Sequence, residues 1–261
     1  MTDKVLATKS GPLGSIVFNN PEKRNAISLD MSLAAADALD DFAADPSVRV
    51  IVLSGAGDKA FISGGDISKF EGSRSTPEQV AEYARKAARF RTTLRSIGKP
   101  TIAKIRGYCL GGGLGVALHC DLRICAEDAQ FSIPAARLGI GYGVDGIALL
   151  VPLVGPSVAK EILYTARRFK ADEALRVGLV NRVVPAAELD AVVAGYVETM
   201  ANNAPLSIIA AKRVVDELVK DADKRDTALC DQVVADCFAS QDYVEGRRAF
   251  MEKRKAAFTG R

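Results

Sequence analysis

The clearest signal in the sequence is the stretch Gly107-Tyr108-Cys109-Leu110-Gly111-Gly112-Gly113-Leu114-Gly115-Val116-Ala117-Leu118-His119-Cys120-Asp121. It follows strand-like residues at 101–106 and passes through a run of glycines into apolar residues that can start a helix. Glycines let a ligand approach the backbone closely, and the first N–H groups of a helix have no partner within it. We therefore expect an oxygen that carries negative charge to bind at this turn.

A dinucleotide pyrophosphate is one such anion, but its G-x-G-x-x-G fingerprint fails here. Gly111, Gly113 and then Val116 occupy the three glycine places, and Asp121 comes too early to contact a ribose. Glycines that serve only close packing of a helix against a strand remain an alternative. A second glycine turn at 54–67 follows the strand predicted at 48–53. Two strand ends with free amides can converge on one oxygen.

Length and composition narrow the class of protein. The 261 residues allow one large domain with an ample core, and a net charge of +3 is too small to imply a nucleic-acid partner. No apolar run is long enough to span a membrane, and the first residues resemble no secretory leader, so we expect a cytoplasmic protein without a membrane partner. One histidine and five cysteines without a C-x-x-C pair predict neither a metal site nor a disulfide framework.

The pattern of strands and helices divides the chain into two regions. A strand at 14–18, a helix at 29–44 and the strand at 48–53 predict a parallel crossover unit. From residue 186 onward the chain is mainly helical, so we expect an α/β core at 1–185 and a helical region at 186–261. The other predicted elements are strands at 101–106, 122–125, 130–133 and 179–184, and helices at 77–97, 157–166, 171–177, 188–202, 206–220 and 227–255.

Five segments carry a resemblance to a known family: 19–26, 61–67, 107–121, 131–139 and 171–184. In this order they resemble the enoyl-CoA hydratase/isomerase, or crotonase, superfamily over nearly the whole chain. The resemblance implies a crotonase-like α/β fold, with repeated ββα units in a superhelical core and a helical C-terminal trimerisation region. It also implies a homotrimer, or a hexamer built as a dimer of trimers, in which residues 186–261 pack on a neighbouring subunit.

The resemblance further implies an acyl-CoA thioester as substrate, with coenzyme A as part of that substrate and no separate cofactor. It assigns the amides of Gly65 and Gly112 as the donors that stabilise a thioester enolate. Cations at Lys253 to Lys255 are further candidates for contacts with the phosphates. The residues that the resemblance places along the coenzyme A and acyl group are Lys23, Arg24, Ala26, Gly64, Asp66, Ile67, Gly111 and Leu138.

The sequence departs from the hydratases of this family at two positions. Their pattern has one glutamate two residues after the glycine triplet and another directly after the proline of a Phe-x-x-Pro segment. Gly115 and Ala135 occupy these positions here. Because neither residue can hold a water molecule or move a proton, isomerase-type or other proton-transfer chemistry is favoured over two-glutamate hydration.

Two polar side chains remain for the acyl end, and both lie in the segment 139–146. Asp145 is the candidate base, unless it pairs with an arginine or caps the following helix. Tyr142 is expected to orient the acyl group, and its segment is similar to methylmalonyl-CoA decarboxylase. A malonyl-type decarboxylase and a non-catalytic thioester binder therefore remain alternatives. RNA binding by the basic residues of 85–95 is not expected, because such charges are typical of a solvated helix face.

Overall fold

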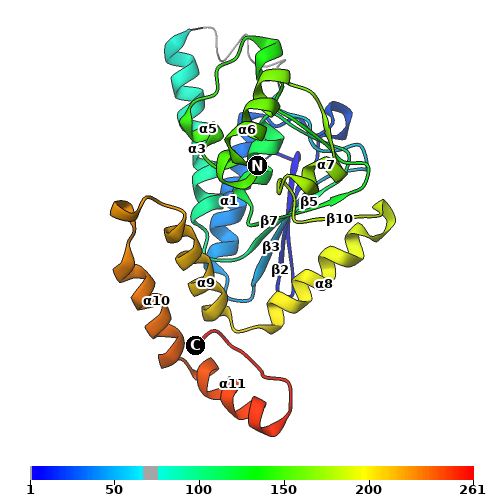
Figure 1. Cartoon of the computed structure of the whole chain (residues 1–261). Helices are drawn as coiled ribbons and strands as arrows, with labels where there is room; N and C mark the ends of the chain where they lie inside the picture. Colours follow the sequence, from blue (N-terminus) through cyan, green and yellow to red (C-terminus); the bar gives the residue numbers. More distant parts are fainter. Residues whose placement is uncertain (1, 67–75) are drawn as a thin grey trace.

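The computed structural model describes residues 2–66 and 76–261 and shows two sheets surrounded by helices (Figure 1). The larger sheet has the strand order β1-β2-β3-β5-β7-β10, and the smaller one has the order β4-β6-β8-β9. The larger sheet consists of β1 (Val5–Ser10), β2 (Leu13–Phe18), β3 (Val50–Gly55), β5 (Thr101–Ile105), β7 (Leu122–Ala126) and β10 (Arg182–Val184). The smaller consists of β4 (Ala60–Ile62), β6 (Tyr108–Leu110), β8 (Gln130–Ser132) and β9 (Phe169–Lys170).

From β3 to β8, consecutive strands alternate between the two sheets. The pairs β3 and β4, β5 and β6, and β7 and β8 each leave the larger sheet and enter the smaller one. Helix α3 (Pro77–Ser96) separates the first pair from the second, and helix α4 (Gly112–His119) separates the second from the third. This repetition of two strands and a helix is the ββα pattern expected from the sequence.

The core forms where the helices cover the sheets. Helix α1 (Leu29–Ala44) lies between β2 and β3 in sequence, as predicted, and those two strands pair in parallel. Its apolar face buries Met31, Leu39 and Phe42. The ring of Phe18 meets Phe61 and Phe90 edge to face at 6.3 and 6.1 Å, which joins β2, β4 and α3 in one cluster.

Four further helices make up the region beyond Pro185: α8 (Leu189–Asn202), α9 (Pro205–Leu218), α10 (Thr227–Ala239) and α11 (Gln241–Glu252). The prediction of one helix over 227–255 is wrong. Ser240 adopts an extended conformation, and its Oγ accepts a hydrogen bond from the Tyr243 amide at 3.1 Å. This serine therefore ends α10 and caps the N-terminus of α11.

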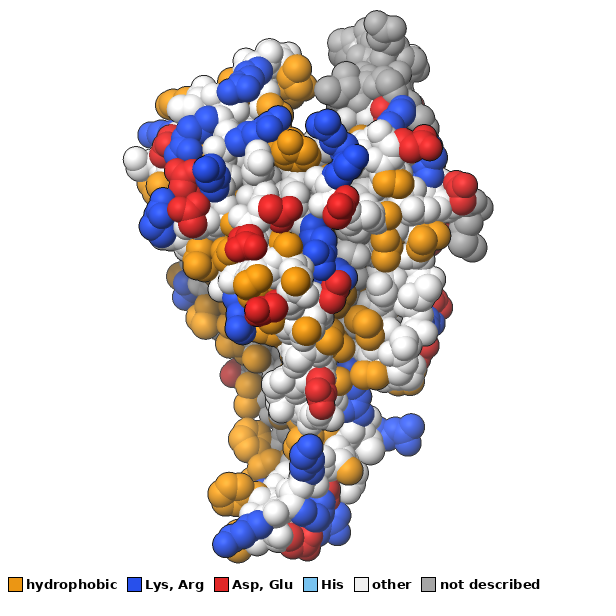
Figure 2. All heavy atoms as spheres, turned by 90° about the vertical axis from the view of Figure 1, so that its right-hand side faces the viewer, with side chains coloured by type: hydrophobic (Ala, Val, Ile, Leu, Met, Phe, Trp, Pro, Cys, Tyr) orange, Lys and Arg blue, Asp and Glu red, His pale blue; other side chains and the backbone are white. Residues whose placement is uncertain are grey.

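These helices differ in what they cover. Helix α8 packs on β3 and β7 of its own chain, with Val193 and Val197 buried against the sheet. Helix α10, all of which is described, buries no side chain. Phe238, Phe250 and Met251 are 62%, 83% and 80% exposed, and Figure 2 shows apolar side chains along the narrow lower part of the molecule. Packing of this region on a neighbouring subunit remains a prediction.

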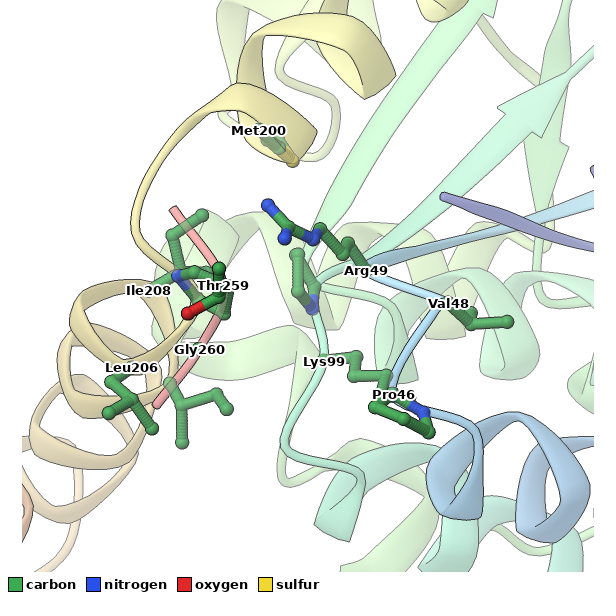
Figure 3. Close-up of a pocket in the computed structure, with 12 residues that line it drawn as sticks. Pro46, Val48, Arg49, Lys99, Met200, Leu206, Ile208, Thr259 and Gly260 are labelled. Carbon is green, nitrogen blue, oxygen red and sulfur yellow. The ribbon is translucent and has the colours of Figure 1, made fainter. Parts of the chain in front are cut away.

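The C-terminal tail folds back onto the core. Arg49 donates one hydrogen bond to the carbonyl of Ala201 at 2.8 Å and another to that of Phe258 at 2.6 Å. The carboxylate of Asp242 accepts hydrogen bonds from the amides of Thr259 and Gly260 at 2.7 and 2.8 Å. A largely apolar cavity of about 160 Å³ remains beside Arg49, between the tail, α9 and the residues before β3 (Figure 3). Because both of these Arg49 hydrogen bonds go to backbone carbonyls, the arginine joins the tail to the core. The cavity is therefore a gap between packed parts of the fold.

The remaining helical elements lie between the strands and helices already described. They are α5 (Val144–Ile147), α6 (Leu150–Thr165), α7 (Ala171–Arg176) and the short 3-10 helices η1 (Pro21–Lys23), η3 (Pro134–Leu138), η4 (Ala186–Glu188) and η5 (Ala222–Lys224). Helix α6 starts seven residues earlier than predicted and is kinked at Gly155, whose φ is +74°. The kink separates its first turn from the segment that the sequence predicts as helical.

Candidate active site

Two glycine turns meet at the ends of β4 and β6. Because these strands pair in parallel, the turn that contains Gly65 and the turn that contains Gly112 lie at the same edge of the smaller sheet. A Cβ atom built on Gly112 would lie 3.6 Å from the amide nitrogen of Gly65. At Gly113 a Cβ would lie only 2.1 Å from the carbonyl oxygen of Ile62, so α4 can begin this close to β4 only with glycine there.

The amides of Gly65 and Gly112 both remain available. Within the described part of the chain, neither donates a backbone hydrogen bond. The atoms around them are engaged: the Asp66 amide donates to Ile27 at 2.9 Å, and the Gly111 amide donates to Ser132 at 2.8 Å. Gly112 is also the first residue of α4, where the helix dipole places partial positive charge. Two N–H groups without a described acceptor thus lie at one edge of the smaller sheet.

A buried asparagine supports the loop that leads into β4 and on to the turn that contains Gly65. Asn25 is fully buried and donates from Nδ2 to the carbonyls of Ala60 and Ala56 at 2.8 and 3.0 Å. Its Oδ1 accepts from the Asn20 amide at 3.0 Å. Gly64 has a φ of +127°, a conformation that only glycine adopts without strain. Asn25 therefore fixes the loop that leads into β4, whereas backbone hydrogen bonds hold the turn before Gly65: the Ser63 amide donates to the Arg24 carbonyl at 3.1 Å.

Several of the predicted coenzyme A residues lie around this turn. The Lys23 ammonium is 3.0 Å from the carboxylate of Asp66, which is 6% exposed, so Asp66 is held in an ion pair beside the first turn. The Arg24 guanidinium lies 5.3 Å from the ring centre of Tyr108. Ala26 is half-buried one residue before Ile27, whose amide donates to Gly64 at 2.8 Å. Leu138 ends η3 and is 52% exposed, and Ile67 lies outside the described residues.

The positions of the two hydratase glutamates have different surroundings. A Cβ built on Gly115 has no heavy atom within 4 Å, so this face of α4 opens onto free space. Ala135 is buried in η3, with 7% of its surface exposed. Neither position offers a proton-transfer group, as the sequence indicates.

Tyr142 lies beside the two turns that contain Gly65 and Gly112, which together form the glycine corner. Its hydroxyl oxygen is 4.0 Å from a Cβ built on Gly111, and its ring packs against the core. Burial raises the pKa of this phenol, while the positive charge of Arg91 opposes that shift. The hydroxyl therefore keeps its proton near neutral pH and can donate a hydrogen bond.

Asp145 lies further out, in the first turn of α5. The N-cap of that helix is Gly143, so Asp145 does not cap it. The carboxylate lines a cavity of about 430 Å³ between α3, α4, α5 and α9. Among the described residues it takes part in no hydrogen bond or ion pair, although arginines line the same cavity. Tyr142 thus lies at the glycine corner, and Asp145 lines the cavity.

The basic residues of α3, which were predicted to form one solvated face, lie on two different faces of the helix. Lys86 pairs with Glu82 at 2.7 Å, and Arg89 pairs with Asp37 and Asp40 of α1, each at 2.7 Å. By contrast, Arg91 and Arg95 line the cavity together with Asp145. Their i,i+4 spacing is the sequence signal that places both on one face of α3. The sequence analysis missed them because the opposite face of that helix carries similar charges.

His119 also lines this cavity, at the end of α4. Its Nδ1 lies 2.7 Å from the carbonyl oxygen of Gly115, which can only accept a hydrogen bond. Burial lowers the pKa of the imidazole, and the charges of Arg91 and Arg95 lower it further. The ring is therefore neutral near pH 7, with its proton on Nδ1.

Residues 2–66 and 76–261 hold no cluster of three or more His, Cys, Asp or Glu side chains placed to bind a metal ion. In the same ranges, no helix combines the length and the apolar character that a membrane span requires.

Comparison with known proteins identifies the family. The enoyl-CoA hydratase/isomerase family profile matches residues 8–261. The chain is 35% identical over 256 residues to the crotonyl-CoA hydratase of Syntrophomonas wolfei subsp. wolfei, with 98% of both chains covered. It is 35% identical over 265 residues to the carnitinyl-CoA dehydratase of Salmonella typhi, with 100% of both chains covered.

Solved structures show the same relationship. An enoyl-CoA hydratase/carnithine racemase from Magnetospirillum magneticum aligns with a TM-score of 0.93 at 33% identity, covering 100% of this chain and 97% of that one. An enoyl-CoA hydratase from Bacillus anthracis aligns with a TM-score of 0.92 at 30% identity, covering 99% and 100%. The crotonase-like fold expected from the sequence is thereby confirmed. The chain belongs to the enoyl-CoA hydratase/isomerase family.

Proposed function

We propose that this acyl-CoA enzyme stabilises a thioester enolate with the amides of Gly65 and Gly112. Removing a proton or a carboxylate next to the thioester carbonyl drives negative charge onto its oxygen. Two preplaced N–H donors lower the energy of that state, and losing one donor costs about 10²- to 10³-fold in rate. The observation that carries the proposal is the meeting of two amides that donate to no described residue.

The chemistry at the acyl carbon is of the isomerase type or another proton transfer. The relatives are named hydratases and a dehydratase, yet Gly115 and Ala135 offer no carboxylate that could hold the attacking water. Asp145 is the acid of the segment 139–146 and serves as the base, while the protonated hydroxyl of Tyr142 orients the acyl group. Proton transfer on an enolate needs one such base rather than two.

Decarboxylation of a malonyl-type thioester is the second candidate. It needs no base, because the departing carbon dioxide leaves its electron pair on the enolate that the two amides hold. The observation that favours it is the hydroxyl of Tyr142, 4.0 Å from a Cβ built on Gly111 and therefore beside the enolate.

The assembly proposed for the chain is a homotrimer, or a hexamer of two trimers. The exposed apolar side chains of α10 and α11 support it, since such surface needs a partner to bury it. Lys253 to Lys255 follow α11, at the opposite end of the molecule from α5 (Figure 1). These lysines would therefore reach the coenzyme A of a neighbouring subunit and not that of their own.

The direct test is mass spectrometry of acyl-CoA thioesters incubated with the purified protein in deuterated water. Deuterium uptake without another change of mass, absent in a protein-free control, is the result expected for an enolate-forming isomerase. Loss of carbon dioxide from a malonyl-type thioester favours the second candidate. Addition of water to an enoyl-CoA contradicts the assignment of chemistry, and tight binding with no product at all identifies a non-catalytic thioester binder.

A further inference from the structure

We propose that the preferred acyl group ends in a carboxylate, and that Arg91 binds this carboxylate in the cavity between α3, α4, α5 and α9. The inference rests on the proposed function for the thioester end of the substrate. It goes beyond that function by naming the class of acyl group and the residue that selects it.

The cavity lies along the path that an acyl chain would take from the glycine corner. Gly115 and His119 are four residues apart on α4 and share one face of the helix. That face is open at Gly115, and at His119 it lines the cavity. Because α4 starts at Gly112 and rises about 1.5 Å per residue, the cavity wall at His119 lies about 10 Å further along the helix axis.

This distance sets the length of the acyl group. An extended chain advances about 1.2 Å per bond, and a charged hydrogen bond adds about 2.8 Å. An acyl chain of about six carbons would therefore bring a terminal carboxylate from the glycine corner to the cavity wall.

Among the described residues, two cations of this cavity, Arg91 and Arg95, take part in no hydrogen bond or ion pair, and Arg91 is the more buried of them because Arg95 is exposed. Two other cations of the cavity are engaged: Arg213 donates to the Ser96 carbonyl at 2.7 Å, and Lys220 pairs with Glu217 at 2.5 Å. A partly desolvated guanidinium without a partner is costly, and a carboxylate satisfies it through two parallel hydrogen bonds.

Arg91 also acts on both ends of the proposed path. Its charge is felt by Tyr142, beside the glycine corner, and by His119, on the cavity wall. The acids in the cavity oppose an incoming carboxylate to different degrees. Asp216 lies in the field of three cations, Lys212, Arg95 and Arg213, and of one other acid, Asp121, whereas Asp145 is exposed. The inner wall beside Arg91 is therefore the part of the cavity that favours an anion.

The test compares two saturated thioesters of equal length that differ only in the terminal carboxylate, adipoyl-CoA and hexanoyl-CoA. Calorimetric titration of the wild-type protein should show about tenfold tighter binding of adipoyl-CoA, the value expected for one charge-assisted pair. Arg91→Met should abolish this preference without weakening hexanoyl-CoA. The matched control is Arg89→Met on the same helix, whose arginine pairs with Asp37 and Asp40 outside the cavity and whose loss should leave the preference intact.

Equal affinity for the two thioesters in the wild-type protein would overturn the inference, and so would a preference that survives Arg91→Met. Deuterium exchange on the same two thioesters reports separately on the proposed function. If neither exchanges while the preference for adipoyl-CoA depends on Arg91, the enolate chemistry is wrong and the inference stands. If hexanoyl-CoA exchanges and binds as well as adipoyl-CoA, the chemistry stands and the inference is wrong.

Discussion

The glycine corner and the acyl end of this protein are built in different ways. The corner is made of backbone: Gly113 packs against Ile62, and hydrogen bonds on either side of Gly65 and Gly112 hold both turns. The acyl end is made of side chains around open space, with Asp145 and Arg91 unpaired among the described residues. Groups fixed by backbone suit a chemical step common to many substrates, and exposed side chains suit the choice of one substrate. Mutations should therefore affect the two regions differently.

The largest expected effect is on the rate of deuterium exchange, when one N–H donor of the glycine corner is removed. Gly112→Pro removes one amide hydrogen at the first position of α4, where proline fits a helix. We expect kcat for deuterium exchange to fall about 10²- to 10³-fold. Gly112→Ala is the control, because it adds the same Cβ 3.6 Å from the Gly65 nitrogen and keeps the N–H group. Equal losses in both variants would show that crowding, and not the missing donor, is responsible.

The next effect is on stability, and two glycines of α4 provide a matched pair. Gly113→Ala drives a Cβ to 2.1 Å from a backbone oxygen and should lower the free energy of unfolding by about 3 kcal/mol or more. Gly115→Ala adds a Cβ into open space and should raise it by about 0.5–1 kcal/mol through helix propensity. Urea unfolding measures both. A stable Gly113→Ala variant would mean that the corner is looser than these distances indicate.

Substitutions at the acyl end should have weaker effects, and the largest of these is expected at Asp145. Asp145→Asn removes the proposed base and keeps the shape of the side chain, so turnover should fall at least about tenfold. Exposed residues of this kind contribute little to stability, and the unfolding midpoint should stay the same. Unchanged turnover would remove Asp145 from the mechanism and leave decarboxylation, which needs no base, as the stronger candidate.

The smallest effect is expected at Tyr142. Tyr142→Phe deletes the hydroxyl that is proposed to donate to the acyl group and keeps the ring packed against the core. Loss of a single neutral hydrogen bond should lower kcat/KM about threefold to tenfold. Steady-state kinetics with the substrate identified by the thioester panel would measure it. A loss of kcat/KM as large as that of Gly112→Pro would mean that Tyr142 acts together with the glycine corner in the chemical step.

The sequence predicts the corner better than the acyl end, and the reason is physical. Glycines mark positions where backbone approaches backbone, so the two turns are recognisable without coordinates, as are β3 and β5. The short strands β4 and β6, which lie between those strands and the turns, were not predicted. Strand β1 was not predicted, since five of its six residues are exposed and show no alternation of buried and exposed positions. The break at Ser240 was missed because apolar periodicity continues across it, although a serine before Gln241 and Asp242 is a helix start signal.

The cavity could not be predicted, because it depends on how four helices far apart in the sequence pack. Arg91 and Arg95 resemble any exposed basic residues until α4 and α9 are placed opposite them. The role of Asp145 depends in the same way on its surroundings. Its neighbours come from α3, α4 and α9, and the sequence alone does not show how close these helices lie to one another.

The proposed role of the corner is tested most directly by the infrared spectrum of a bound thioester whose carbonyl carbon is labelled with ¹³C. Two N–H donors polarise the carbonyl, so its stretching frequency should fall on binding to the wild-type protein relative to the same thioester in water. The shift should shrink in Gly112→Pro and persist in Gly112→Ala. A frequency that does not fall on binding would contradict the assignment of Gly65 and Gly112 as the oxyanion donors.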